Sequence, residues 1–208
     1  MVQREHGDTQ RRVLDVLRRN GQMTAGELSA ALGIGPVGVR QHLAQLENEG
    51  LVLIAGVRRS VGRPSHLYEL SPAAAALFPQ SYDRLAIELL AFLDDRGPGE
   101  VSEFFAQRAA RFLRQHGGRL AGDTLGARIS ALAVVLAEHG YMPELHAKAD
   151  GSYELVQHNC PIQCVAQCYT QSCASELQLY ERILGTPVTR SETIADGGRC
   201  CHYHIAAV

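Results

Sequence analysis

The sequence contains no tryptophan, only one lysine, and aromatic residues at just 6% of its 208 positions. It also lacks a run of the ~20 apolar residues that a membrane-spanning helix needs. The first twelve residues are polar and contain no apolar segment of the kind found in secretory signals, so we expect a cytoplasmic protein with no membrane association. Apolar residues at 46% and charged residues at 20% exclude a disordered chain and are typical of a globular protein.

The helical segments expected after residue 80 carry no Gly-rich phosphate loop, nucleophile motif or specially spaced carboxylate pair. No acyl-transfer or phosphatase motif supports an enzyme either. Histidines near the cysteines leave a cysteine-nucleophile enzyme as an alternative class, but we expect no enzymatic activity. The net charge of −2 excludes a basic nucleic-acid coat. It is unevenly distributed, at +2 before residue 71 and −4 after it. That sign fits an N-terminal nucleic-acid-binding domain joined to an acidic partner domain.

The first 72 residues carry the signals of a compact DNA-binding domain. Helical periodicity appears over 9–20, from Thr24 and from Pro36. Thr24 and Glu27 have the spacing of a capping box, and Pro36 suits the first turn of a helix. Two short strands, 51–54 and 66–70, flank an arginine-containing loop. Helix, helix, turn, helix and hairpin in this order predict a winged helix-turn-helix domain over 1–72.

The outward face of the third helix predicts DNA contacts, because the N-terminal end of a recognition helix enters the major groove. Arg40 suits guanine and Gln41 suits adenine. Arginines of the hairpin suit phosphates or the minor groove. A winged helix used only for protein contacts is the alternative. The expected DNA-binding residues are Pro36, Val37, Gly38, Arg40, Gln41, Arg58, Arg59 and Arg63.

The remaining chain mixes helical and strand patterns. Residues 73–79 fit a linker or short helix, and further helices are expected over 80–96, from Pro98, and over 123–139. Their apolar faces suit a core or a dimer interface. A hairpin over 144–157 and strands over 188–194 and 200–205 predict an antiparallel sheet. We therefore expect an α+β protein whose C-terminal domain, 80–208, serves as sensor and dimerisation domain.

All six cysteines fall in the last quarter of the chain, at positions 160, 164, 168, 173, 200 and 201. Pro161 predicts a helix capped by Cys160, and Glu176 predicts a helix capped by Cys173. Thiolates would be favoured at both positive helix ends. Disulfides are disfavoured in a reducing compartment. Buried thiols, structural zinc and an iron–sulfur cluster stay open, because the spacing matches no C-x₂-C zinc knuckle.

Several motifs along the chain resemble the SufR-type family of iron–sulfur winged-helix repressors, which have DeoR/ArsR-like helix-turn-helix domains. Those in the N-terminal domain are Val39–Leu43, Glu49–Val52 and Gly62–Pro64 with Tyr68–Ser71. Those in the C-terminal domain are His158–Ile162, Cys173-x-x-Glu176, Leu184–Arg190 and Gly198-x-x-Cys201.

The resemblance implies a homodimer that binds a palindromic double-stranded operator, commonly that of an iron–sulfur assembly operon, and that releases it when the cluster is lost. It places cluster ligands at Cys160, Cys173 and Cys201, with a 4Fe-4S cluster preferred to 2Fe-2S. Many members have a further cysteine where this chain has Val156. The fourth ligand therefore stays open among Cys164, Cys168, Cys200, His158 and a non-protein ligand. A zinc-binding or thiol-based redox-sensing regulator is the alternative.

Overall fold

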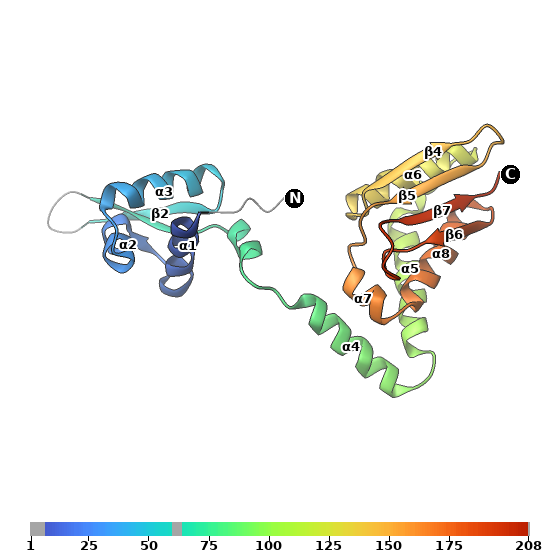
Figure 1. The fold of residues 1–208 in the computed structure, drawn as a ribbon, viewed down its shortest axis with the longest axis horizontal. Coiled ribbons are helices and arrows are strands. Elements are labelled where there is room, and N and C mark those ends of the chain that lie inside the picture. The colour runs from blue at the N-terminus through green and yellow to red at the C-terminus, as the bar shows by residue number, and fades with distance from the viewer. Residues whose placement is uncertain (1–6, 60–63, 208) are drawn as a thin grey trace. The chain divides into compact units, whose positions relative to one another are not determined.

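The computed structural model describes residues 7–59 and 64–207. The chain divides into two compact units, Met1–Gln80 and Ser81–Val208 (Figure 1). Arg63, one of the predicted DNA contacts, lies outside the described residues. Within the described part of the chain, no helix is both long and apolar enough to cross a membrane.

Three helices form the first unit: α1 (Asp8–Asn20), α2 (Ala25–Leu32) and α3 (Pro36–Asn48). The predicted capping box begins α2, because the Glu27 amide donates to Thr24 Oγ1 at 3.2 Å and the Thr24 amide donates to the Glu27 carboxylate at 2.8 Å. Pro36 begins α3, where its missing N–H leaves no bond unmade. Their buried faces share one core, which includes Leu17, Leu28, Val39, Leu43 and Leu46.

A three-stranded antiparallel sheet completes this unit, in the order β1-β3-β2. Its strands are β1 (Met23–Thr24), β2 (Val52–Arg58) and β3 (Ser65–Leu70), and the short 3-10 helix η1 (Pro72–Leu77) follows. The sequence predicted that the strand now labelled β2 ends at Ile54. This end is wrong, because pairing with β3 resumes after a bulge at Ile54–Gly56. The arrangement confirms the predicted winged helix-turn-helix.

The second unit contains five helices within its described residues, namely α4 (Tyr82–Arg96), α5 (Glu100–Leu120), α6 (Leu125–Glu138), α7 (Gln163–Cys168) and α8 (Gln171–Leu184). The predicted helix start at Pro98 is wrong. Gly97 and Gly99 adopt φ of 155° and 99°, which a right-handed helix excludes, so α5 begins at Glu100.

Four antiparallel strands form the sheet of the second unit, in the order β4-β5-β7-β6. They are β4 (Pro143–Ala147), β5 (Tyr153–Gln157), β6 (Val188–Glu192) and β7 (Cys201–Ile205). The last two are shorter than expected, because residues 193–200 form a loop that folds back on itself through a bond from the Gly198 amide to the Thr193 carbonyl. The mixed architecture confirms the predicted α+β class.

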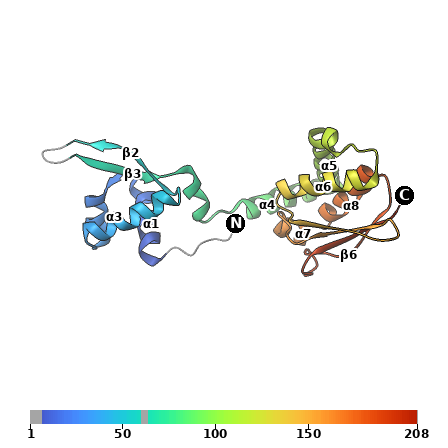
Figure 2. The same cartoon turned by 90° about the horizontal axis from the view of Figure 1, so that it is seen from above.

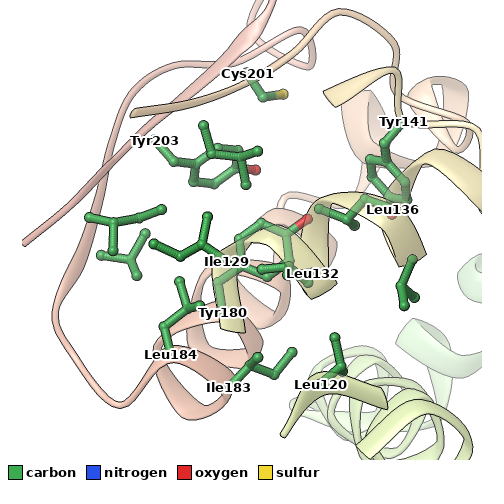
Figure 3. Close-up of a cluster of buried hydrophobic side chains, with 14 of the residues drawn as sticks. Leu120, Ile129, Leu132, Leu136, Tyr141, Tyr180, Ile183, Leu184, Cys201 and Tyr203 are labelled. Carbon is green, nitrogen blue, oxygen red and sulfur yellow. The ribbon is translucent and has the colours of Figure 1, made fainter. Parts of the chain in front are cut away.

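Helices α6 and α8 lie over one face of this sheet (Figure 2). Because side chains alternate along a strand, Leu155 and Tyr203 point into the helices, whereas Glu154 and His204 lie on the opposite face. Figure 3 shows the resulting core, in which the rings of Tyr180 and Tyr203 meet edge to face with centroids 5.2 Å apart. The inner face of the sheet is therefore where α8 can meet β5 and β7.

Candidate DNA-binding surface and cysteine site

The N-terminal half of α3 presents an exposed surface built from small and polar residues. Val39 and Leu43 fix the helix to the core, and this orientation leaves Val37 68% exposed. Pro36, Arg40 and Gln41 are exposed as well. Gly38 adds to the open surface, since a Cβ built there meets nothing within 4 Å. This end of α3 can therefore approach a large partner closely.

The hairpin carries two described arginines with different surroundings. Arg59 is exposed, whereas the Arg58 guanidinium forms an ion pair with Glu27 at the start of α2. Both side chains of that pair are partly exposed, at 47% and 43%. The pKa of Glu27 is lowered, first by the bond from the Thr24 amide and then by Arg58. One carboxylate thus caps α2 and holds the hairpin.

Three of the six cysteines, Cys160, Cys173 and Cys201, lie close enough to affect one another's ionisation. Cys160 follows β5, Cys173 lies in the first turn of α8, and Cys201 begins β7. Cys201 is buried in the core, and Cys160 packs against that core. Figure 3 shows Cys201 at the edge of the core, near Tyr203. The fold thus gathers the three cysteines for which the family resemblance implied a ligand role.

The local structure around two of these cysteines differs from the prediction. Cys160 caps no helix, because Pro161 lies in a turn and α7 begins only at Gln163. Cys173 lies inside α8, whose cap is Thr170. Cys164 and Cys168 share α7, and Cys160 lies outside it.

Two of the three sulfurs accept a hydrogen bond from the backbone: the Ile194 amide donates to Cys201 Sγ at 3.4 Å, and the Ile162 amide donates to Cys160. Cys173 Sγ lies 3.9 Å from the Ser172 hydroxyl, which donates to the Tyr169 carbonyl at 2.9 Å. Burial nevertheless raises the pKa of all three thiols, that of Cys160 to about 11. The expectation that helix ends favour the thiolate is therefore wrong for the chain without a metal, because burial outweighs the donors.

The other predicted ligands lie in different surroundings. Cys164 and Cys168 are exposed on α7. Cys200 is beside Glu192, and burial together with that carboxylate raises the pKa of its thiol. His158 Nε2 lies 3.0 Å from a carboxylate oxygen of Glu144. Cys200 and His158 thus lie beside carboxylates, whereas Cys164 and Cys168 are exposed.

Sequence reasoning missed Glu176 as a member of this site. Its carboxylate interacts electrostatically with Cys160, Cys173 and Cys201 alike. Tyr180 Oη donates to Glu176 Oε1, and Gln157 Nε2 donates to Tyr180 Oη at 2.6 Å. Burial raises the pKa of Glu176. The sequence did hold a signal, because Glu176 interrupts an otherwise buried helix face formed with Tyr180 and Ile183.

A cavity of about 500 Å³ opens beside Glu176. Helix α5 lines it with Arg108 and Phe112, and α8 lines it with Glu176 and Tyr180. Pro161, which follows Cys160, also reaches the cavity wall. Small solutes entering the cavity would therefore reach the Glu176 side of the cysteine site.

Comparison with known proteins identifies part of the N-terminal unit. Residues 7–53 match the model of the bacterial regulatory protein, arsR family. No curated protein matches the chain. The protein is a transcriptional regulator of the winged-helix type.

Solved structures that are similar to parts of this regulator include the following three. The zinc-responsive MarR family member ZitR of Lactococcus lactis is 19% identical, with 66% of this chain and 78% of that one covered at a TM-score of 0.30. A MarR family transcription regulator is 22% identical, with 55% and 76% covered at 0.31. The Zalpha domain of PKZ from Carassius auratus, in complex with Z-DNA, is 25% identical, with 30% and 92% covered at 0.25.

The donors of the regulator's cysteine site can be compared with what a metal requires. Within residues 7–59 and 64–207, no group of three or more His, Cys, Asp or Glu side chains is arranged to hold a single metal ion. A zinc ion draws each thiolate to within about 2.3 Å of one point. In a cluster, the thiolates bind different irons and stay farther apart. Thiolates bind both zinc and the irons of a cluster, so the donor atoms of Cys160, Cys173 and Cys201 suit either group by their chemistry.

Proposed function

We propose that the regulator is a repressor whose operator binding is controlled by an iron–sulfur cluster held by Cys160, Cys173 and Cys201. The observation that carries this proposal is the gathering of these three cysteines, from three separate segments, at one site with amide donors to two of the sulfurs. On the family resemblance, the target is an operon for iron–sulfur assembly.

The exposed end of α3 is the surface we assign to base recognition. Arg40 can bond guanine with two donors, and Gln41 can bond adenine. Pro36, Val37 and Gly38 allow close approach to the DNA backbone. Arg59 and Arg58 suit phosphate contacts, and Arg58 would first have to leave Glu27.

The regulator acts as a homodimer in this proposal, and α4 supplies the interface. Four large apolar side chains of α4 are 52–75% exposed: Tyr82, Leu85, Leu89 and Phe92. Their spacing of three, four and three residues is that of one apolar seam on a helix pair. A matching helix of a second copy would cover the seam, and two recognition helices would then read a palindromic operator.

The cysteine site can couple metal binding to the shape of the second unit. When bound, the cluster supplies a redox-active, oxidant-sensitive group. The chain supplies thiols that must lose their protons first, because thiolates are the metal-binding form. Amides of Ile162 and Ile194 are already in place to stabilise two of the thiolates. Loading would tie the start of β7 to the first turn of α8, and loss would release them.

Six single Cys→Ala variants, purified without oxygen, test the proposal. We expect a brown wild-type protein that contains iron and sulfide, and that binds its operator more tightly than the metal-free form. Variants at 160, 173 and 201 should lose the iron and the regulation together. Variants at 164, 168 and 200 are the matched controls and should retain both. A colourless protein with one zinc ion per chain, or a metal-free protein that forms a disulfide with peroxide, would overturn the proposal.

A further inference from the structure

We propose that the cavity of about 500 Å³ between α5 and α8 binds a small organic anion with a flat apolar body, of the aromatic carboxylate class. Its volume falls in the range of about 300–1,000 Å³ in which proteins bind small molecules. This binding depends neither on the cluster nor on the dimer proposed above. It would give the regulator a second input, separate from the cysteine chemistry.

The cavity is formed by the facing sides of two helices. Its lining positions on α5 recur at intervals of one to four residues from Phe104 to Gln115, and those on α8 do so from Ser172 to Tyr180. Such spacing places the lining residues of each helix along one face. Ser175 Oγ of α8 donates to the Phe105 carbonyl of α5 at 3.0 Å, which fixes the two helices to each other beside the cavity. The walls are therefore rigid elements, and the space is already formed before a ligand enters.

The charged groups of the lining favour an anion. Arg108 and Arg111 line the cavity, and Glu176 is the one carboxylate among the described lining residues. Arg108 interacts with the Tyr141 hydroxyl and with Glu176. No described residue forms a hydrogen bond or an ion pair with the Arg111 side chain. One guanidinium is thus left over, and a guanidinium can donate two parallel hydrogen bonds to a carboxylate.

The apolar groups of the lining favour an aromatic body. The Phe104 side chain is 43% exposed, and its ring meets that of Phe105 edge to face with centroids 5.1 Å apart. Phe112 lies two turns farther along α5, and its ring contacts that of His139 with centroids 5.5 Å apart. Because Arg108 falls between Phe104 and Phe112 on the helix, cationic and aromatic groups share one wall. A flat ring that carries a carboxylate matches both kinds of group.

The same wall of α5 also contacts α4. The Phe105 side chain is 3% exposed and belongs to a small core with Leu90 of α4 and Val101. Phe105 also lines a second cavity, of about 250 Å³, together with Leu89 and Leu93 of α4. A ligand held against Phe105 would therefore restrain the packing of α5 on α4, the helix to which we assign the dimer interface.

Calorimetric titration of the purified full-length protein with naphthoate tests the proposal. We expect saturable binding of one naphthoate per chain. Naphthamide keeps the rings but lacks the negative charge, and acetate keeps the charge but lacks the rings. Both should bind at least about tenfold more weakly, because each loses one of the two kinds of contact. Equal affinity for naphthoate and naphthamide would overturn the assignment of an anion site.

Three variants place the binding in this cavity. Arg111→Gln should weaken naphthoate binding about tenfold. Arg114→Gln is the matched control, because it removes an exposed arginine of the same helix that does not line the cavity, and it should match wild type. Ala109→Phe should abolish binding by filling the space, and the exposed Arg111 keeps the test valid if Ala109→Phe does not fold. Absence of saturable binding to wild type, or equal affinities of Arg111→Gln and Arg114→Gln, would overturn the proposal.

Discussion

Glu27 joins two parts of the winged helix, and its substitution should affect stability and DNA binding in opposite directions. The residue accepts a bond from the Thr24 amide at 2.8 Å and pairs with Arg58 of the hairpin. In Glu27→Gln, the amide can still complete a capping box, but it cannot hold the arginine by charge. The variant should therefore be less stable, with Arg58 released for phosphate contact.

The stability change can be bounded from the exposure of the pair. With side chains 47% and 43% exposed, the ion pair contributes about 0–1 kcal/mol. Losing the whole cap, as in Thr24→Ala, should cost about 1 kcal/mol. Urea unfolding should thus rank wild type, Glu27→Gln and Thr24→Ala in order of falling stability.

The pH dependence of this difference has a definite sign. The pKa of Glu27 is lowered in the folded protein, so its carboxylate stabilises the fold above the unfolded value of about 4.3. That contribution is lost as the pH falls through the lowered folded value. Wild type and Glu27→Gln should therefore differ in unfolding free energy at pH 7 and converge below about pH 4.

Fluorescence anisotropy with operator DNA over 50–200 mM salt measures the second effect. One additional phosphate contact steepens the dependence of log affinity on log salt by about 0.9. Glu27→Gln should show this steeper slope, and Arg58→Ala should show a shallower one than wild type. Glu69→Gln is the control, since it removes the same charge from the neighbouring β3 without releasing an arginine. Equal slopes for Glu27→Gln and Glu69→Gln would refute the reasoning.

Three further changes test other parts of the molecule. Arg40→Ala should cost about 1–3 kcal/mol of discrimination at one base pair of the operator, with little change in the affinity for random DNA. The control Arg114→Ala removes an exposed charge of the second unit and should leave both affinities unchanged. An equal loss of affinity for random DNA would make Arg40 a phosphate contact. Leu89→Glu should shift the protein from dimer to monomer in light scattering. The control Val134→Glu, on α6 and 55% exposed, should leave the dimer intact. If Leu89→Glu remains a dimer, the assignment of α4 to the interface is wrong. Gly198→Ala should lower the melting temperature and the iron content, because the added Cβ would lie 2.7 Å from the Thr193 carbonyl oxygen. An unchanged melting temperature and iron content would show that the loop before β7 adjusts freely.

The first unit was predictable because its signals are local. The capping box of Thr24 and Glu27 and the proline at the start of α3 each depend on residues within one helical turn. The periodic apolar residues of α1 and α3 then place Arg40 and Gln41 outward without further information. What could not be predicted was the pairing of Arg58 with Glu27, since these residues are 31 positions apart.

The cysteine segments were harder because their local signals admit more than one structure. A proline suits the first turn of a helix but also a turn before it, and Pro161 occupies the turn. The Gln163 amide then bonds the Cys160 carbonyl at 3.1 Å, and this bond holds Cys160 outside α7. Once Cys160 is separated from the helix, the i+4 spacing to Cys164 no longer places their thiols on one face.

Glu176 shows why a residue of the cysteine site can escape sequence reasoning even when its motif is recognised. The Cys173-x-x-Glu176 pattern predicted a cap at Cys173, yet Thr170 caps α8 and both residues lie half-buried within the helix. The partners that give Glu176 a chemical role, Gln157 on β5 and Cys201 on β7, are 19 and 25 positions away in the sequence. Only the antiparallel pairing of β5 with β7 beneath α8 brings them together, because that pairing sets Gln157 opposite Cys201. The carboxylate therefore becomes part of the cysteine site through the register of the sheet, and a shift of that register by one residue would turn Cys201 to the outer face and dismantle the site.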